Sequence, residues 1–244
     1  MDSVESSRAA LAGGADRLEL CDNLIEGGTT PSAGMVAACR EVVPLPLFVM
    51  IRTRGGDFVV SDDEAGVMRR DVASAVALGA GGIVSGALTA AGEVDELRVR
   101  ALVEAAGAVP VTFHRAFDVC RNRTAALDTL ARLGVRRVLT SGGATTALEG
   151  AEGIRRLVRH ADGRVTIVAG GGINESNARQ VVEATGVREI HVRCASAIPG
   201  SGPWNPAIRF RRASDLDERS RLVSDSARLR LVRDQTSHDS LTHS

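Results

Sequence analysis

Short apolar segments alternate with longer amphipathic segments along most of the chain. The apolar segments are rich in Val, Ile and Leu, which is typical of strands whose two faces are both buried. The segments that fit this description are 17–21, 47–53, 82–86, 109–114, 136–141, 165–170 and 188–193. Strands of this kind, separated by amphipathic segments, predict a parallel sheet covered by helices.

The amphipathic segments place apolar residues three or four positions apart, as a helix does on its buried face. This spacing predicts helices over 3–12, 63–78, 95–106, 124–133 and 174–184. The expected N-cap residues are Asp62 or Asp63, Asn122 and Asn174. Glycines such as Gly79 and Gly134 follow several of these helices, and they suit the left-handed residue that closes a last turn.

This order of elements fits two kinds of α/β fold. The sheet is either open and doubly wound, or closed into a TIM-type (βα)8 barrel, in both cases with right-handed crossovers. The chain opens directly in the helix over 3–12, whereas a complete barrel needs a strand in front of that helix. The pattern therefore predicts that a barrel built from this chain would lack its first strand.

The composition changes near the end of the chain. From residue 211 onward the sequence is mainly Arg, Asp and Ser with scattered Leu and Val. We therefore expect one folded domain over 1–210 and a polar C-terminal tail over 211–244, partly helical or disordered. Within that tail we expect a helix near 224–233 and disorder over 235–244, including His238 and His243.

Composition and charge narrow the classes of function. The 244 residues are 44% hydrophobic and 25% charged, which predicts a globular core. The formal net charge is zero, so we expect neither nucleic acid nor a membrane as a partner. The sequence contains no lysine, which excludes a Schiff base with pyridoxal phosphate (PLP) and a P-loop. No Gly-x-Gly-x-x-Gly follows a predicted strand, so we expect no nicotinamide or flavin cofactor.

The cysteines and the first residues indicate a cellular setting. Cysteines at positions 21, 39, 120 and 194 have neither Cys-x-x-Cys spacing nor the density of a disulfide framework. The first residues have neither a basic nor an apolar stretch, so we expect no signal peptide, and no apolar run approaches the roughly 18 residues that a membrane span needs. We expect a reduced, cytoplasmic protein.

Polar residues gather where the predicted strands end, and parallel α/β folds bind ligands at that end of the sheet. The candidate catalytic residues are Glu19, Arg52, Arg54, Asp57, His114, Arg115 and Asp118. The candidate anion-binding residues are Thr140, Ser141, Gly170, Gly171, Gly172 and His191. Arginines can bind a carboxylate or phosphate, a histidine or a buried glutamate can move a proton, and glycine-rich turns can bind anions.

Each candidate also has a structural alternative. The two arginines could pair with Glu19, Glu26 or Asp57, and the glycines could form a tight turn. Cys21 is the candidate metal ligand, because its thiol lies at a strand end on the same face as Glu19 and soft thiolates suit Cu(I) or Zn(II). A lone cysteine is more often a small buried apolar residue.

Several long blocks carry a resemblance to a known family. They are Glu19-Leu20-Cys21, 26–32 (EGGTTPS), 51–58 (IRTRGGDF), 111–118 (VTFHRAFD) and 137–142 (RVLTSG). In this order they resemble the CutC family, which is named for copper homeostasis, and the resemblance runs from about Asp2 to His191. It implies a TIM-like barrel over 1–210, a cytoplasmic location, homo-oligomers in some members, and copper as a ligand.

The resemblance also implies a copper site at Cys21, which matches a position proposed to bind copper in some relatives. The family begins with a further strand that carries its own Glu and Cys, and this strand is missing here. A two-thiolate copper site would thereby lose one ligand. After His191 the sequence follows the family pattern poorly.

Three hypotheses about function follow. The first is a cytoplasmic protein of copper homeostasis that binds Cu(I) through Cys21. The second is a TIM-barrel enzyme that acts on a small phosphorylated or carboxylated substrate by Glu/His acid–base chemistry. The third is a poorly folded remnant, which a broad thermal transition would indicate. The expected partners are therefore a copper ion or a small anionic ligand, together with a second copy of the chain.

Overall fold

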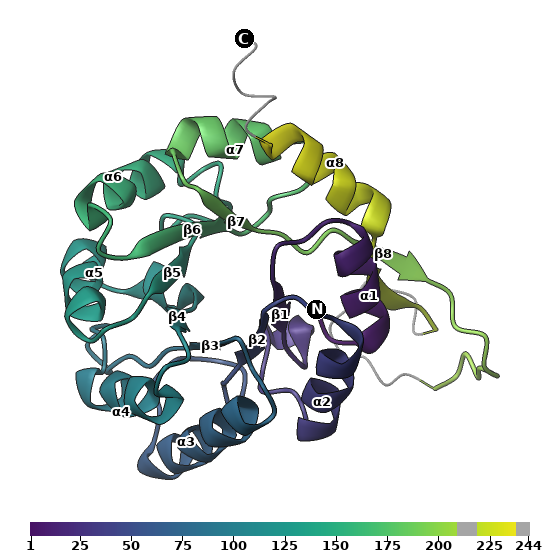
Figure 1. Ribbon diagram of the computed structural model, residues 1–244, viewed down its shortest axis with the longest axis horizontal. Coiled ribbons are helices and arrows are strands. Elements are labelled where there is room, and N and C mark those ends of the chain that lie inside the picture. Colours follow the sequence, from purple (N-terminus) through teal and green to yellow (C-terminus); the bar gives the residue numbers. More distant parts are fainter. Residues whose placement is uncertain (209–218, 238–244) are drawn as a thin grey trace.

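The computed structural model describes residues 1–208 and 219–237 (Figure 1). Seven parallel strands form one curled sheet in the order β1 to β7, and helices surround its outer face, as in TIM-barrel-type folds. The strands are β1 (Leu18–Leu20), β2 (Leu47–Met50), β3 (Gly82–Ser85), β4 (Val111–Phe113), β5 (Arg137–Thr140), β6 (Thr166–Gly170) and β7 (Glu189–His191). Each lies inside one of the seven predicted segments, so the fold class is confirmed.

Helices alternate with these strands along the chain. They are α1 (Val4–Ala12), α2 (Ala33–Val42), α3 (Asp62–Ala77), α4 (Glu96–Ala106), α5 (Arg123–Arg132), α6 (Ala151–Ala161) and α7 (Ala178–Thr185). Short 3-10 helices occupy Leu24–Glu26 (η1) and Arg115–Val119 (η2). The sequence pattern predicted five of the seven α-helices, and α2 and α6 were not predicted.

Two of the expected N-caps are wrong, for local reasons. The cap of α3 is Ser61, whose side chain accepts from the backbone N–H of Glu64 while Glu64 bonds back to Ser61. Asn174 accepts from Ser176 in a turn, so α7 begins only at Ala178. Asn122 caps α5 as predicted.

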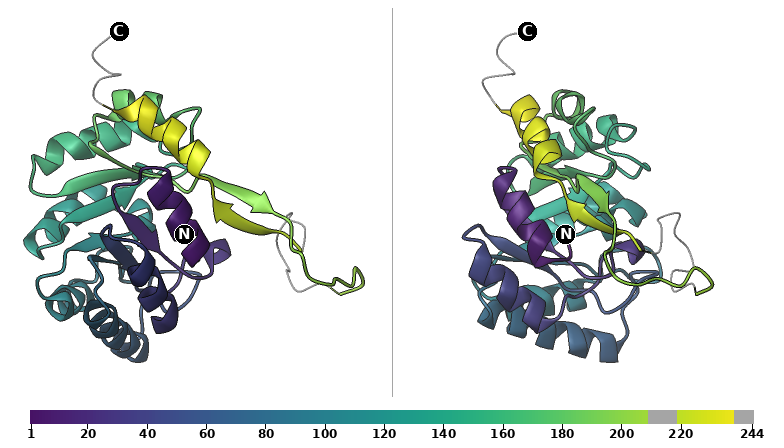
Figure 2. Two further views of the ribbon diagram at one scale, coloured as in Figure 1. Left: turned by 45° about the vertical axis from the view of Figure 1, so that its right-hand side comes forward. Right: turned by 90° about the vertical axis from the view of Figure 1, so that its right-hand side faces the viewer.

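The segment after β7 adds a hairpin and a helix to the barrel. Strand β8 (Ala195–Ile198) pairs antiparallel with β9 (Arg221–Ser224), and this hairpin projects from the body (Figure 2). Helix α8 (Ser226–Thr236) then packs between α1 and α7, close to the helix predicted at 224–233. The predicted domain boundary falls within 209–218 and most of the predicted disorder within 238–244, both outside the described residues.

The sheet ends at β1 on one side and at β7 on the other. In the described residues no ladder joins these two strands. The backbone of Met1 lies against β1, where its N–H group donates to the Glu19 carbonyl and its carbonyl accepts from the Cys21 N–H. Between the sheet and the helices, the core contains large buried side chains such as Leu47, Ile83 and Leu130.

Candidate functional site

A cavity of about 670 Å³ lies where the polar strand ends meet, and we call it the main cavity. Such a volume suits a small metabolite. The predicted site residues that line it are Glu19, Cys21, Arg52, His114, Arg115, Gly171, Gly172 and His191. The remaining candidates, which do not line it, are Arg54, Asp57, Asp118, Thr140, Ser141 and Gly170.

Arg52 follows β2 and is buried without a carboxylate partner. Its Nη1 donates to the carbonyl oxygens of Glu26 (2.8 Å) and Gly28 (3.2 Å), and its Nη2 donates to that of Gly56 (2.8 Å). Three of its five N–H groups are thus used, and Nε has no partner among the described residues. Burial lowers the pKa of Arg52, and the nearby Arg54 adds to this. The fixed guanidinium is therefore suited to bind an anion.

The aromatic ring of Phe58 helps to hold this guanidinium. It lies 4.9 Å from the Arg52 Cζ in a cation–π contact, and 5.1 Å from the imidazole ring of His114. Phe58 belongs to one of the family blocks, but no role was predicted for it. The Arg-Gly-Gly-Asp-Phe order of 54–58 could have indicated one, because the turn brings Phe58 back over the end of β2.

His114 ends β4 and is almost fully buried, with 4% of its surface exposed. Its Nδ1 accepts the backbone N–H of Ala116 at 3.3 Å, so the neutral ring carries its proton on Nε2. No described group is bonded to that Nε2. Burial, together with the charge of Arg52, lowers the pKa of His114 to about 4. At neutral pH the side chain is therefore an uncharged donor with its N–H unused.

Glu19 of β1 stays ionised inside the barrel. Burial raises its pKa, but His191, the N-terminal ammonium and the hydrogen bond from Cys21 together lower the pKa to about 2. Its Oε1 lies 3.6 Å from Nε2 of His191 on β7, and it accepts from the Cys21 thiol at 3.6 Å. The pair places a carboxylate behind a histidine that is 39% exposed in its side chain, an arrangement that suits proton transfer.

Arg115 and Asp118 act as one unit in η2. The Arg115 Nε donates to the Asp118 carboxylate at 2.8 Å, and its Nη2 donates to the Ser141 Oγ at 2.7 Å. The same carboxylate accepts from the Thr140 hydroxyl and from the backbone N–H groups of Ser141 and Gly143. Asp118 is thus a positioning residue that connects the turn after β5 to Arg115. Thr140 and Ser141 help to hold Asp118 in place by donating hydrogen bonds to its carboxylate.

Arg54 and Asp57 lie away from the main cavity. Arg54 pairs with Glu64 at 2.6 Å and with Asp57 at 3.1 Å on the surface. These contacts fix the turn of 54–59 above α3. Gly170 is also outside, because it packs against Leu139, where a Cβ would lie 2.6 Å from a methyl group.

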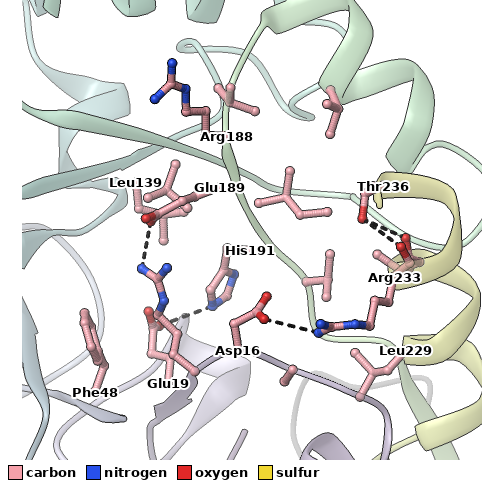
Figure 3. A pocket seen from close by; sticks show the side chains of 18 of the residues that line it. Asp16, Glu19, Phe48, Leu139, Arg188, Glu189, His191, Leu229, Arg233 and Thr236 are labelled. Carbon is pink, nitrogen blue, oxygen red and sulfur yellow. Dashed lines mark hydrogen bonds and ion pairs between the residues drawn. The ribbon is translucent and has the colours of Figure 1, made fainter. Parts of the chain in front are cut away.

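A second cavity of about 320 Å³ opens between β1, β7 and α8 (Figure 3). It meets the main cavity at Glu19 and His191, which line both. Inside it, Glu189 bonds to Arg17 and Arg137, at 2.7 and 3.1 Å. Both guanidiniums lie within 6 Å of the centre of the Phe48 ring, so this cluster is internally satisfied.

The wall of the main cavity offers a copper ion the thiol of Cys21. Burial, however, raises the pKa of this thiol, and the charge of Glu19 raises it further. Cu(I) binds the thiolate, so the proton must leave when the metal enters. The described residues contain no group of three or more His, Cys, Asp or Glu side chains placed to hold a metal.

The seven parallel strands and the outer helices define a TIM-barrel-type protein, and its polar cavity lies at the strand ends, where such folds usually bind ligands. The family model of the CutC family matches residues 1–196. The chain belongs to the CutC family.

Individual relatives agree with this assignment. The human "copper homeostasis protein cutC homolog" is 44% identical over 233 residues, which cover 95% of this chain and 85% of that protein. A "family protein CutC" of Xanthomonas axonopodis pv. citri is 48% identical over 209 residues, covering 85% and 87% of the two chains.

Solved structures give the same fold. A crystal structure of CutC from Streptococcus agalactiae matches with a TM-score of 0.70 and 36% identity, and covers 72% of this chain and 87% of that one. Thiamine phosphate pyrophosphorylase from Pyrococcus furiosus matches with a TM-score of 0.58 and 18% identity, over 96% and 88% of the chains, which shows the fold alone. Within the described ranges, no helix has the length and apolar character needed to cross a bilayer.

Proposed function

We propose that the main cavity binds a small organic anion and catalyses proton transfer on it. The observation that carries the proposal is the buried guanidinium of Arg52, which backbone carbonyls orient, while its Nε has no partner and no described carboxylate is hydrogen-bonded to it. Buried donors of a charged group are costly to leave without an acceptor. An anionic ligand would accept hydrogen bonds from the free N–H groups of this arginine.

The neighbouring side chains suit the two halves of a proton transfer. His191, backed by the ionised Glu19, is the candidate proton acceptor at the edge of the cavity. His114 presents a neutral Nε2–H that can donate a hydrogen bond to an oxygen that gains negative charge. The substrate class is thus a small carboxylate or phosphate ester that loses a proton near its anionic group.

The test compares two arginines of one turn. Small carboxylates and phosphate esters are titrated into the full chain, and deuterium uptake from heavy water into each ligand is followed by NMR. Arg52→Met should weaken anion binding at least about 10-fold and stop the exchange, by loss of charge-assisted hydrogen bonds. Arg54→Met is the matched control, because Arg54 pairs with Glu64 outside the cavity. Equal effects of the two substitutions, or an absence of any bound anion, would refute the proposal.

A second candidate is a role in copper homeostasis with Cu(I) as the cargo. The names of the human and murine relatives support it, and Cys21 faces the main cavity beside Glu19. We further propose a cytoplasmic location, since all four cysteines are free thiols.

An anaerobic Cu(I) titration against a competing chelator tests this candidate. If Cys21 is a ligand, the wild type should bind one ion and Cys21→Ser should lose it. Cys120→Ser is the control, because Cys120 is also a buried thiol but lies outside the main cavity. Binding that is equal in all three proteins would remove Cys21 from any copper role.

A further inference from the structure

We infer that the Arg115 side of the main cavity is a subsite for the phosphate group of a small phosphate ester. The inference rests on the proposed function, because it adds to the group held by Arg52 a phosphate on the same ligand and says where that phosphate binds.

The Arg115 guanidinium is held in a fixed orientation, but not all of its N–H groups have a hydrogen-bond acceptor. Asp118 and Ser141 fix the plane of its guanidinium through Nε and Nη2. No described residue accepts a hydrogen bond from Nη1, so both of its N–H groups are available. Nη1 lies 3.3 Å from the position that a Cβ would take on Gly171, so the charged group is in contact with the loop after β6.

This loop presents bare backbone to the cavity. Gly171 and Gly172 both have positive φ, at 104° and 70°, and together with Ile173 they line the main cavity. In the described structure no acceptor is bonded to the N–H groups of Gly172 and Ile173. Successive free N–H groups in such a turn form a concave anion-binding surface. A Cβ on Gly172 would lie 2.9 Å from Thr146, so only glycine leaves this backbone open.

The charge of the cavity provides an independent reason to expect an anion. Its wall contains three arginines, Arg52, Arg115 and Arg193, and two carboxylates, Glu19 and Glu26. The wall also contains the unpartnered Nε2 of His114, a side chain more than nine-tenths buried. Buried donors without acceptors are rare in proteins unless a ligand or water completes them.

The geometry of the donors favours phosphate over carboxylate. The Nη1 of Arg115 and the two backbone N–H groups of Gly172 and Ile173 belong to different parts of the chain, so they approach a bound group from different directions. A tetrahedral phosphate offers three terminal oxygens to such a set, whereas a planar carboxylate offers two that suit one edge of an arginine. The second arginine, Arg52, remains free to bind another polar group of the same molecule.

Isothermal titration of the full chain with inorganic phosphate, and separately with acetate, tests the subsite. The wild type should bind phosphate more tightly than acetate. Arg115→Met should weaken phosphate binding about 10- to 100-fold, because it removes charge-assisted hydrogen bonds. Arg121→Met is the matched control, because this exposed arginine lies outside the cavity and should leave binding unchanged.

The result that overturns the inference is phosphate binding by Arg115→Met equal to that of the wild type. If this variant fails to fold, Arg115→Lys replaces it: the positive charge is kept and the fork is lost, so phosphate affinity should fall while the thermal transition persists. Phosphate affinity of the lysine variant equal to wild type would equally refute the subsite. A different result would refute the proposed function, namely that Arg52→Met binds every anion with the same affinity as the wild type.

Discussion

Protonation of His114 should destabilise the folded protein in mildly acidic solution. The ring is buried beside the Arg52 guanidinium, and its pKa falls from 6.5 in the unfolded chain to about 4 in the folded one. Between these two pKa values His114 binds a proton in the unfolded chain but not in the folded one, so the free energy of unfolding must fall as the pH falls. From pH 7 to pH 5, linkage for this one group gives a loss of about 2 kcal/mol in the free energy of unfolding.

Urea denaturation followed by circular dichroism at pH 7 and pH 5 measures this loss. The comparison is with His114→Gln, which removes the titrating ring and keeps a polar side chain of similar reach. Other groups titrate in both proteins, so the wild type should lose about 2 kcal/mol more than the variant over this interval. An equal loss in both proteins would show that His114 is not held neutral by its surroundings, and the assignment of its Nε2–H as a donor would fall with it.

Three further predictions concern the support of the site. The lowered pKa of Glu19 stabilises the wild type by about 3 kcal/mol above pH 4.5, and this stabilisation is lost as the pH falls toward 2. Acid titration should show this step in the wild type and not in Glu19→Gln, which lacks the titrating carboxyl group. Asp118→Ala should cost about 3 kcal/mol in urea denaturation, because the hydroxyl of Thr140 and the N–H group of Ser141, both buried residues, lose their acceptor; a cost below about 1 kcal/mol would contradict its positioning role. Gly150→Ala should lower the thermal midpoint strongly, because its Cβ would lie 1.8 Å from the Ser141 carbonyl oxygen, and an unchanged midpoint would contradict the packing of α6.

The strands were predictable because each is a short segment that contains Val, Ile, Leu or Phe, a signal that needs no knowledge of neighbouring elements. Helix α6 was missed although Ile154, Leu157 and Ala161 form a helical stripe, since Gly150 at its start offers no side-chain cap. Three of the ten residues of helix α2 are Ala and one is Gly, which weakens its apolar periodicity. In both helices the packing against the sheet decides the structure, and that packing is not visible in a local pattern.

The location of the candidate site was predictable from the sequence, but the roles of its individual residues were less so. Polar residues at strand ends had to meet, because parallel strands share one carboxyl edge. The same rule could not show that Arg54 turns outward to Glu64, or that Asp118 is enclosed by the turn after β5. Those outcomes depend on loop conformation, which contacts between distant segments determine. The role of Cys21 as a copper ligand and the anion-binding roles of the cavity residues stay predictions.

The attachment of the C-terminal elements to α1 has a consequence for how the chain folds during synthesis. Arg233 pairs with Asp16 and bonds to the Gly14 carbonyl, and the Ser224 N–H bonds to Ser6. Helix α1 precedes strands β1 to β7 in the sequence, whereas α8 follows all of them, so α8 is synthesised after the sheet that α1 joins. The outer face of α1 therefore stays uncovered while the sheet assembles, and the docking of α8 is a late step that couples α1 and α8 into one cooperative unit.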